Sequence, residues 1–166
     1  GWMSFTSAST AFTNTALPAV ALPNNTIAPL WDDYDMRNNV GICLYRSDPA
    51  LGRFIVEWKK VTRFNALTDT LTFEAVLCQD GSIQYRYLSV KGILNSNTIG
   101  IENAGGTTGL QVVFNANYVH NNLAVLIQND QEWLSATPTS GSVAPGGSQN
   151  VDVALDPTGL PLGMHT

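Results

Sequence analysis

The chain has 166 residues, enough for one domain with a proper core and part of a second. Charged residues make up 13% of it, about half the usual share, so solubility rests on Asn, Thr, Ser, Gln and Gly, as suits a secreted protein. The net charge of -5, with nothing basic after Lys91, excludes nucleic acid and anionic membrane surfaces as partners, because both require clustered Lys and Arg.

The sequence contains no export signal with a basic region followed by an apolar one, and no apolar run long enough to cross a bilayer. Membrane insertion is therefore not expected. We interpret the sequence as a piece of a longer polypeptide, with any export signal lying upstream.

Short runs rich in β-branched and aromatic residues recur between clusters of Gly, Pro, Asn and Asp, which predicts an all-β fold. One helical turn is expected around Asn115–Asn122. The predicted strands are Trp2–Phe5, Val40–Arg46, Arg53–Thr62, Thr70–Gln79, Ser82–Val90, Thr98–Glu102, Leu110–Phe114 and Leu123–Gln128.

The segment TLTFEAVLCQDGSIQYRYLSV predicts a hairpin with the three-residue loop Gln79-Asp80-Gly81 and Gly81 in the left-handed region. This register places Phe73 opposite Tyr87, with Ala75–Tyr85 and Leu77–Ile83 on the same apolar face. Glu74 then lies opposite Arg86 on the other face, and the clean separation of the two faces supports the register.

The preceding strand adds Phe54, Val56 and Trp58 to the apolar face and Glu57 and Lys59 to the charged face. Such a sheet requires a covering layer, for which the apolar strands at 99–101, 112–114 and 125–127 are available. The predicted fold is therefore an antiparallel β-sandwich.

Cys43 and Cys78 are expected on strands two apart, separated by the Arg53–Thr62 strand. A disulfide requires Cα atoms within about 7 Å, whereas strands two apart lie roughly 9–10 Å apart. Two unbridged thiols are therefore the preferred interpretation over one bridge.

From Gln131 the composition changes to a Pro-, Gly- and Ser-rich tail with two short predicted strands, Trp133–Ala136 and Gln149–Leu155. A segment of this length does not bury a core alone. We therefore predict a sandwich domain over residues 1–129 and the truncated first strands of a second β-sandwich module over residues 130–166, with Trp133 as its anchor.

The three acids Asp32, Asp33 and Asp35 are the most suggestive chemical cluster. Ca²⁺ takes six to eight oxygen ligands, and these carboxylates together with Asn38 and Asn39 would supply several. The alternative is that one Asp bonds its own backbone at a turn while another is solvated at a strand end, so that PNNTIAPLWDDYD is chiefly a sheet corner. Trp31 is expected to fill the end of the sandwich rather than to stack on a sugar.

Catalytic arrangements fit the sequence less well. A glycosidase requires two carboxyl groups facing each other across a cleft, whereas Glu57 and Glu74 are predicted side by side on an open face beside Lys59 and Arg86. His120, expected in a loop, and His165 lie far apart without zinc-ligand spacing. We expect no catalytic residue.

Several short motifs follow one another along the chain: Ala28–Trp31, Asp33 and Asp35, Tyr45-Arg46, the Phe73-to-Gly81 run and Ile99–Ile101. In this order they resemble the motifs of the nidogen-like extracellular domain and its bacterial relatives. Cys43 and Cys78 depart from this pattern. The resemblance implies a non-catalytic module of an adhesive, matrix or large secreted protein. The tail resembles the first strands of BACON-type immunoglobulin-like repeats of bacterial surface and secreted carbohydrate-active proteins.

These observations predict an extracellular or cell-surface module that acts as an adhesion or spacer unit of a larger protein. The alternatives are a glycan-binding module, with Ca²⁺ as an organiser at Asp32–Asp35, and a fragment of a secreted hydrolase. Expected partners are other domains of the parent polypeptide, extracellular polysaccharide or matrix protein, and a second copy joined through exposed strand edges.

Overall fold

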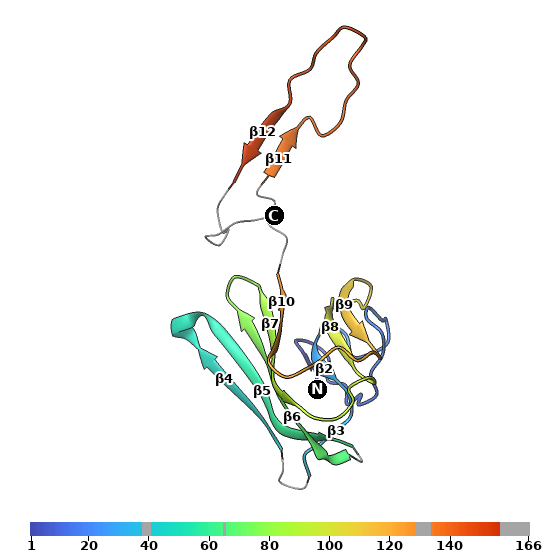
Figure 1. Ribbon diagram of the computed structural model, residues 1–166, viewed down its shortest axis with the longest axis vertical. Coiled ribbons are helices and arrows are strands. Elements are labelled where there is room, and N and C mark those ends of the chain that lie inside the picture. The colour runs from blue at the N-terminus through green and yellow to red at the C-terminus, as the bar shows by residue number, and fades with distance from the viewer. Residues whose placement is uncertain (38–40, 65, 129–133, 157–166) are drawn as a thin grey trace. The chain divides into compact units, whose positions relative to one another are not determined.

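The computed structural model of the chain describes residues 1–37, 41–64, 66–128 and 134–156. It divides into two compact units, residues 1–128 and 129–166, each of which is described by itself below. The regular secondary structure of the described residues consists of strands and one short 3-10 turn, η1 (Pro49–Leu51), which confirms the all-β prediction (Figure 1).

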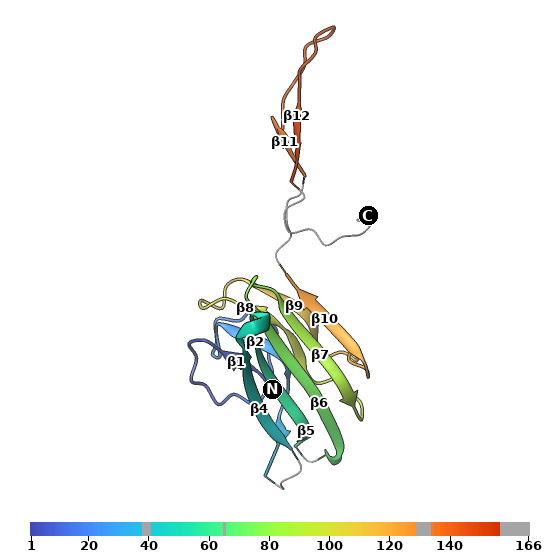
Figure 2. The same ribbon diagram turned by 90° about the vertical axis from the view of Figure 1, so that its left-hand side faces the viewer.

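The first unit is a sandwich of two antiparallel sheets. The larger sheet has the strand order β10-β7-β6-β5, and both β3 and β4 pair with β5 (Figure 2). Its strands are β3 (Tyr34–Asp35), β4 (Ile42–Asp48), β5 (Arg53–Arg63), β6 (Ala66–Cys78), β7 (Ile83–Val90) and β10 (Leu123–Ile127).

The smaller sheet covers one face of the larger one and has the order β1-β2-β8-β9. Its strands are β1 (Met3–Ser4), β2 (Thr26–Trp31), β8 (Thr98–Glu102) and β9 (Gly109–Phe114). Residues 103–108 form the β8–β9 hairpin loop, in which the Asn103 side chain accepts hydrogen bonds from the backbone N–H groups of Thr107 and Thr108.

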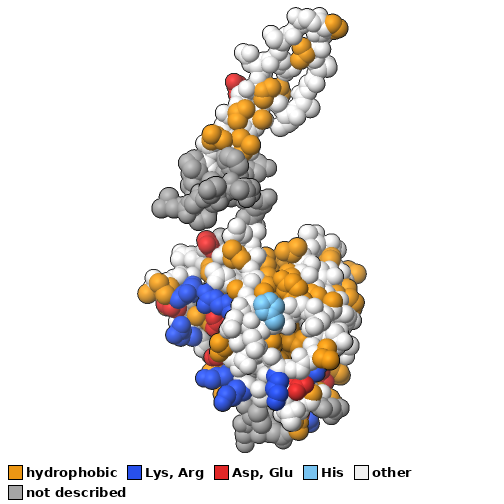
Figure 3. Space-filling view, viewed as in Figure 1, with side chains coloured by type: hydrophobic (Ala, Val, Ile, Leu, Met, Phe, Trp, Pro, Cys, Tyr) orange, Lys and Arg blue, Asp and Glu red, His pale blue; other side chains and the backbone are white. Residues whose placement is uncertain are grey.

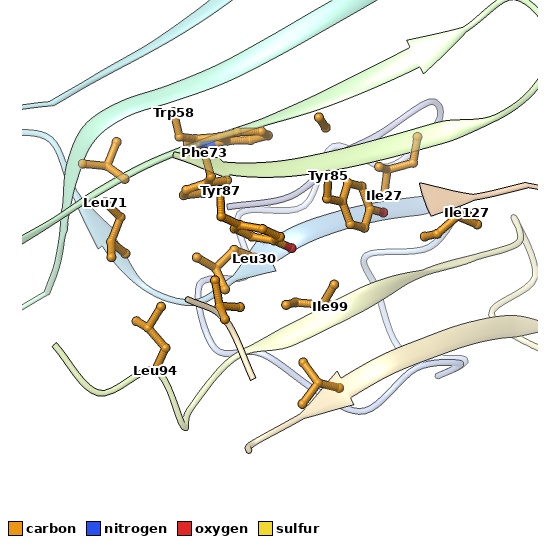
Figure 4. Close-up of a cluster of buried hydrophobic side chains, with 14 residues drawn as sticks. Ile27, Leu30, Trp58, Leu71, Phe73, Tyr85, Tyr87, Leu94, Ile99 and Ile127 are labelled. Atoms are coloured by element: carbon orange, nitrogen blue, oxygen red, sulfur yellow. The ribbon is translucent and has the colours of Figure 1, made fainter. Parts of the chain in front are cut away.

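The core lies between the sheets and is rich in aromatic rings (Figure 4). Phe73 of β6 stacks between Trp58 of β5, at 5.0 Å between ring centroids, and Tyr87 of β7, at 6.3 Å. Leu30 and Ile99 contribute from the smaller sheet. Burying such rings is the main favourable term for joining two sheets.

The β6–β7 hairpin has the predicted register, with Phe73, Ala75 and Leu77 opposite Tyr87, Tyr85 and Ile83. Gly81 has a φ of 86°, and its N–H donates to the Cys78 carbonyl across the loop. On the opposite face Arg86 Nη1 lies 3.1 Å from Glu74 Oε1. The alternation of side chains therefore fixes both the pairing and the buried face.

Two sequence predictions about these elements are wrong. Leu123–Ile127 pairs with β7 and so extends the larger sheet, whereas the layer over the core is completed by β1 and β2. Residues 115–122 contain no helical turn, and Asn115 and Asn122 instead adopt positive φ values of 48° and 61°. Asn supports this left-handed backbone better than most residues, and the segment ends in a single turn in which the Leu123 N–H donates to the His120 carbonyl.

Strand β5 contains a bulge that keeps its apolar residues facing inward. Trp58 lies opposite Phe73 and Val61 opposite Leu71, so β5 has one residue more than β6 between these pairs. Lys60 takes the extra position with a φ of 53°, and its N–H donates to Thr72 Oγ1 at 3.1 Å. The bulge explains why Lys59 and Lys60 are both exposed while Val61 returns to the core.

In the second unit the described residues form one antiparallel hairpin, β11 (Leu134–Thr137) with β12 (Asp152–Leu155). Leu134 lies opposite Leu155 and Ala136 opposite Val153, which places these apolar side chains on one face. Trp133 and the predicted boundary between residues 129 and 130 lie outside the described residues. The assignment of this unit to a BACON-type repeat remains a prediction.

No helix within the described ranges of the chain has the length and apolar character to cross a membrane.

Candidate functional site

The chain passes from the smaller sheet to the larger one at the turn between β2 and β3. Asp32 Oδ1 accepts a hydrogen bond of 2.8 Å from the Asp33 N–H, and Asp32 Oδ2 accepts one of 3.0 Å from Ser96 Oγ. The Asp33 carbonyl accepts the N–H of Phe64. The side chain of Asp32 therefore holds the turn in place, as an Asx residue does in many turns.

Asp35 forms a two-pronged ion pair with Arg37. The Arg37 Nε lies 3.0 Å from Asp35 Oδ1, and Nη2 lies 2.7 Å from Oδ2. Hydrogen bonds from the Arg37 side chain and backbone hold the pKa of the Asp35 carboxyl at about 2. Asp35 is therefore charged at neutral pH, and both of its oxygens already accept strong hydrogen bonds.

These bonds bear on the predicted calcium site. Among the described residues no three His, Cys, Asp or Glu side chains form a group suited to a metal ion. Asn38 and Asn39, the other expected oxygen donors, lie outside the described residues. The site at Asp32, Asp33 and Asp35 remains a prediction, and binding of Ca²⁺ by Asp35 would require displacement of Arg37.

An open hollow of about 650 Å³ lies beside this corner and combines aromatic and charged walls. The Arg37 guanidinium lies 5.6 Å from the centre of the Phe64 ring, within the range of a cation–π contact. Phe12 and Met36 add exposed apolar surface. The hollow is lined by Phe12, Asp33, Tyr34, Asp35, Met36, Arg37 and Phe64.

Sequence reasoning pointed to Asp33 and Asp35 but missed Phe12, Arg37 and Phe64. Phe12 lies in an irregular, uncharged segment and Phe64 at the end of β5, so no periodic pattern marked either side chain. The signal that was present is the order Asp35, Met36, Arg37, because an acid and an Arg two residues apart are within reach of a bidentate pair.

Most of the large rings belong to the core rather than to the surface. Trp31 and Trp58 are buried, as predicted, and Trp2 packs partly buried against Trp31 at 6.1 Å between ring centroids. The hydroxyl of Tyr85 donates to the Gly100 carbonyl at 2.8 Å, and that of Tyr87 donates to the Pro29 carbonyl. Burial raises the pKa of both phenols, so they remain neutral donors that link the two sheets.

A second hollow, of about 380 Å³, lies on the outer face of the larger sheet. Glu57 and Glu74 lie directly opposite each other on β5 and β6 and both line it. Arg86 bonds Glu74 and also donates to Gln84 Oε1 at 2.7 Å. The two acids therefore stand side by side on one face, as the sequence predicted, rather than across a cleft. Figure 3 shows Lys and Arg side chains gathered over the larger sheet.

Cys43 and Cys78 are both free thiols. Cys43 pairs with Trp58 on one side of β5, and Cys78 pairs with Arg53 on the other side. The intervening strand and the offset of five residues along it keep the thiols apart. Although Cys43 is exposed, partial desolvation by neighbouring atoms raises the pKa of its thiol, so the thiol is protonated at neutral pH.

Two antiparallel sheets around an aromatic core, with open hollows at a corner and on the outer face, define a β-sandwich module. The family model of NIDO-related domains matches residues 1–144, and the chain belongs to this family. Domains of the nidogen type are in general extracellular and non-catalytic. The comparisons with curated proteins and with solved structures found no match.

Proposed function

We propose that the first unit is a non-catalytic extracellular module that serves as an adhesion or spacer unit of a larger secreted or surface protein. The observation that carries this proposal is the geometry of Glu57 and Glu74, which are neighbours on an open sheet face with Arg86 beside Glu74. Glycoside hydrolysis requires a general acid with a raised pKa facing a second carboxylate across the substrate. Two carboxylates on neighbouring strands of one sheet face do not stand on opposite sides of a substrate, so this geometry does not meet that requirement.

The packing of the first unit fits a spacer or adhesion role. Hydroxyls of buried tyrosines join the two sheets, and the large rings fill the space between them. The expected partners are neighbouring domains of the parent polypeptide and extracellular polysaccharide or matrix protein.

The test separates hydrolysis from binding. The complete chain is incubated with soluble polysaccharides, and release of reducing sugar is measured beside the variants Glu57→Gln and Glu74→Gln. We expect release at the level of buffer for all three proteins. Release by the unchanged chain that disappears in both variants would overturn the proposal. Retention on insoluble polysaccharide or immobilised matrix protein then measures adhesion.

The hollow beside the corner favours a second candidate, a glycan-binding module. Sugars are bound in proteins by aromatic faces together with charged groups that accept and donate hydrogen bonds, and Phe12, Phe64, Asp33 and Arg37 supply both. We infer that a neutral oligosaccharide fits this hollow better than an acidic one, because Asp35 and Arg37 neutralise each other and Asp33 adds one negative charge to the lining.

Two variants test the glycan site against a matched control. Phe12→Ala and Phe64→Ala should each weaken retention on a polysaccharide column, whereas Phe5→Ala, which removes another exposed ring that does not line the hollow, should not. Equal retention of all three variants would remove the hollow from consideration. Melting curves with Ca²⁺ and with a chelator test the metal: an unchanged melting temperature would count against calcium at Asp32, Asp33 and Asp35.

A further inference from the structure

Strand β4 forms a free margin of the larger sheet. It pairs with β5 through seven consecutive residue pairs without a bulge, and within the described part of the chain no strand lies on its other side (Figures 1 and 2). Its residues Ile42–Ser47 are all exposed. Every second residue of such a strand directs an unpaired N–H and C=O group outward, which makes it a template for another strand.

An exposed pair of rings lies at the same margin. Tyr45 of β4 is 79% exposed and stacks on Phe54 of β5, 38% exposed, at 6.0 Å between ring centroids. Tyr45 lies opposite Val56, so it belongs to the face of the larger sheet that carries the core. The smaller sheet does not extend over these rings, and they meet solvent instead.

Strand β4 also has few of the features that usually protect a free margin. Protected edges carry charged side chains, above all Lys, or Pro or a bulge. Within Ile42–Asp48 there is no Lys and no Pro, and Arg46 and Asp48 cancel in charge. The margin is therefore locally neutral in a chain whose net charge is -5, so charge repulsion opposes contact between two copies little at this margin.

We propose that β4 is the contact strand of a homodimer, in which β4 of one copy pairs antiparallel with β4 of a second copy about a two-fold axis at Tyr45. This register aligns all seven residues, Ile42 of one copy with Asp48 of the other and Leu44 with Arg46. The two Tyr45 rings then meet at the centre, each flanked by Phe54 of its own copy. Such an interface is isologous and closes at two copies.

A second copy would both pair the free backbone groups of β4 and cover the exposed rings of Tyr45 and Phe54. A sugar bound on the rings would leave the backbone groups of β4 unpaired. In the aligned register each charged residue lies opposite an uncharged one of the other copy, so no like charges meet directly. The other margin of the larger sheet, β10, offers a shorter run of five residues that ends in the buried Ile127. The inference does not depend on the proposed adhesion or spacer role.

The mass of the complete chain in solution tests the dimer. Sedimentation equilibrium across the micromolar range should give about twice the monomer mass of 17.9 kDa. Leu44→Lys and Tyr45→Lys should each weaken the dimer at least about tenfold, because they place a charge on the paired margin. Leu88→Lys, at an exposed site on β7 with 67% exposure, is the matched control and should leave the mass unchanged. Circular dichroism checks that each variant is folded.

A monomer at every concentration would overturn the proposal, and so would a dimer that neither strand variant weakens. The register has its own test. In the proposed pairing Cys43 lies opposite Ser47 of the second copy, at a Cα distance that permits a disulfide. Ser47→Cys should therefore give an oxidised dimer on a non-reducing gel, and adding Cys43→Ser should abolish it. A dimer that forms no such crosslink would contradict the register.

Discussion

Two of the hairpins in the described part of the chain share the same local pattern but have different surroundings. In β6–β7, the pairs Phe73–Tyr87 and Ala75–Tyr85 share one face of the ladder, and that face lies under the smaller sheet. In β11–β12, the pairs Leu134–Leu155 and Ala136–Val153 share one face, and Leu134, Val153 and Leu155 are exposed.

Alternation alone is not expected to stabilise a hairpin. Two strands with an apolar face are marginal in water, and stability requires a second layer that removes this face from solvent. We therefore expect a substitution in β6–β7 to lower the free energy of unfolding more, the more completely the smaller sheet covers the substituted side chain. Equivalent substitutions in β11–β12 should have little effect.

The largest effect is expected from removal of a covered ring. Phe73→Ala should lower the free energy of unfolding by about 3–5 kcal/mol, because it empties the centre of the Trp58–Phe73–Tyr87 stack. Val153→Ala, at a side chain with 62% exposure, should change it by less than about 0.5 kcal/mol. Urea denaturation followed by tryptophan fluorescence and by circular dichroism measures both. Equal effects would show that covering by the smaller sheet is not what distinguishes the hairpins.

A smaller effect is expected from removing a hydroxyl that joins the layers. Tyr87→Phe keeps the ring but leaves the Pro29 carbonyl without its donor, at a cost of about 1–3 kcal/mol. Tyr45→Phe removes an exposed hydroxyl and should be nearly neutral. Thermal and urea unfolding of the two variants gives the comparison. A neutral Tyr87→Phe would mean that water replaces the lost bond.

The turn of the covered hairpin contributes less again. Gly81→Ala should cost about 1 kcal/mol, because an L-residue is strained at a φ of 86°. No atom lies within 4 Å of the added Cβ, so the cost comes from the backbone alone. Gly105→Ala in the β8–β9 loop, where φ is not positive and contacts are ordinary, is the control. Similar costs at both sites, by chemical denaturation, would contradict this account.

The smallest effect is expected on the uncovered face of the same hairpin. The coupling between Arg86 and Glu74, measured by a double-mutant cycle with Arg86→Ala and Glu74→Gln, should be about 0.2–1 kcal/mol and should shrink as salt is added. A coupling as large as the effect of Tyr87→Phe would mean that this face is shielded from water.

The sequence predicted the parts of the fold in which one face is buried and the other exposed. Residues 53–90 alternate between apolar and polar side chains, so the pairing of β5, β6 and β7 followed directly from them. It did not predict β2, because all six residues from Thr26 to Trp31 are buried, so no alternation marks them, and Pro29 argues against a strand. The partner of Leu123–Ile127 was wrong for a similar reason: an uninterrupted apolar run does not indicate which sheet it joins.

The candidate site was predicted only as a cluster of acids. The sequence indicated that Asp32, Asp33 and Asp35 mark a corner, and the structure places the passage between the sheets there. It did not indicate that Arg37 holds Asp35 or that Phe12 joins the same hollow, since Phe12 comes from a segment more than 20 positions away with no periodic signal. Contacts between irregular segments depend on the folded path of the chain, which no local pattern encodes.

The bulge at Lys60 has a consequence for changes in chain length. Most one-residue deletions within a strand exchange its inner and outer side chains beyond the deleted position, which is why insertions and deletions are rare in sheets. Here β5 already carries a surplus residue relative to β6, and removing Lys60 would leave Trp58 and Val61 facing inward with one residue between them. Homologous chains that differ in length by one residue are therefore expected to differ at this point of the strand more readily than at any other residue of β5.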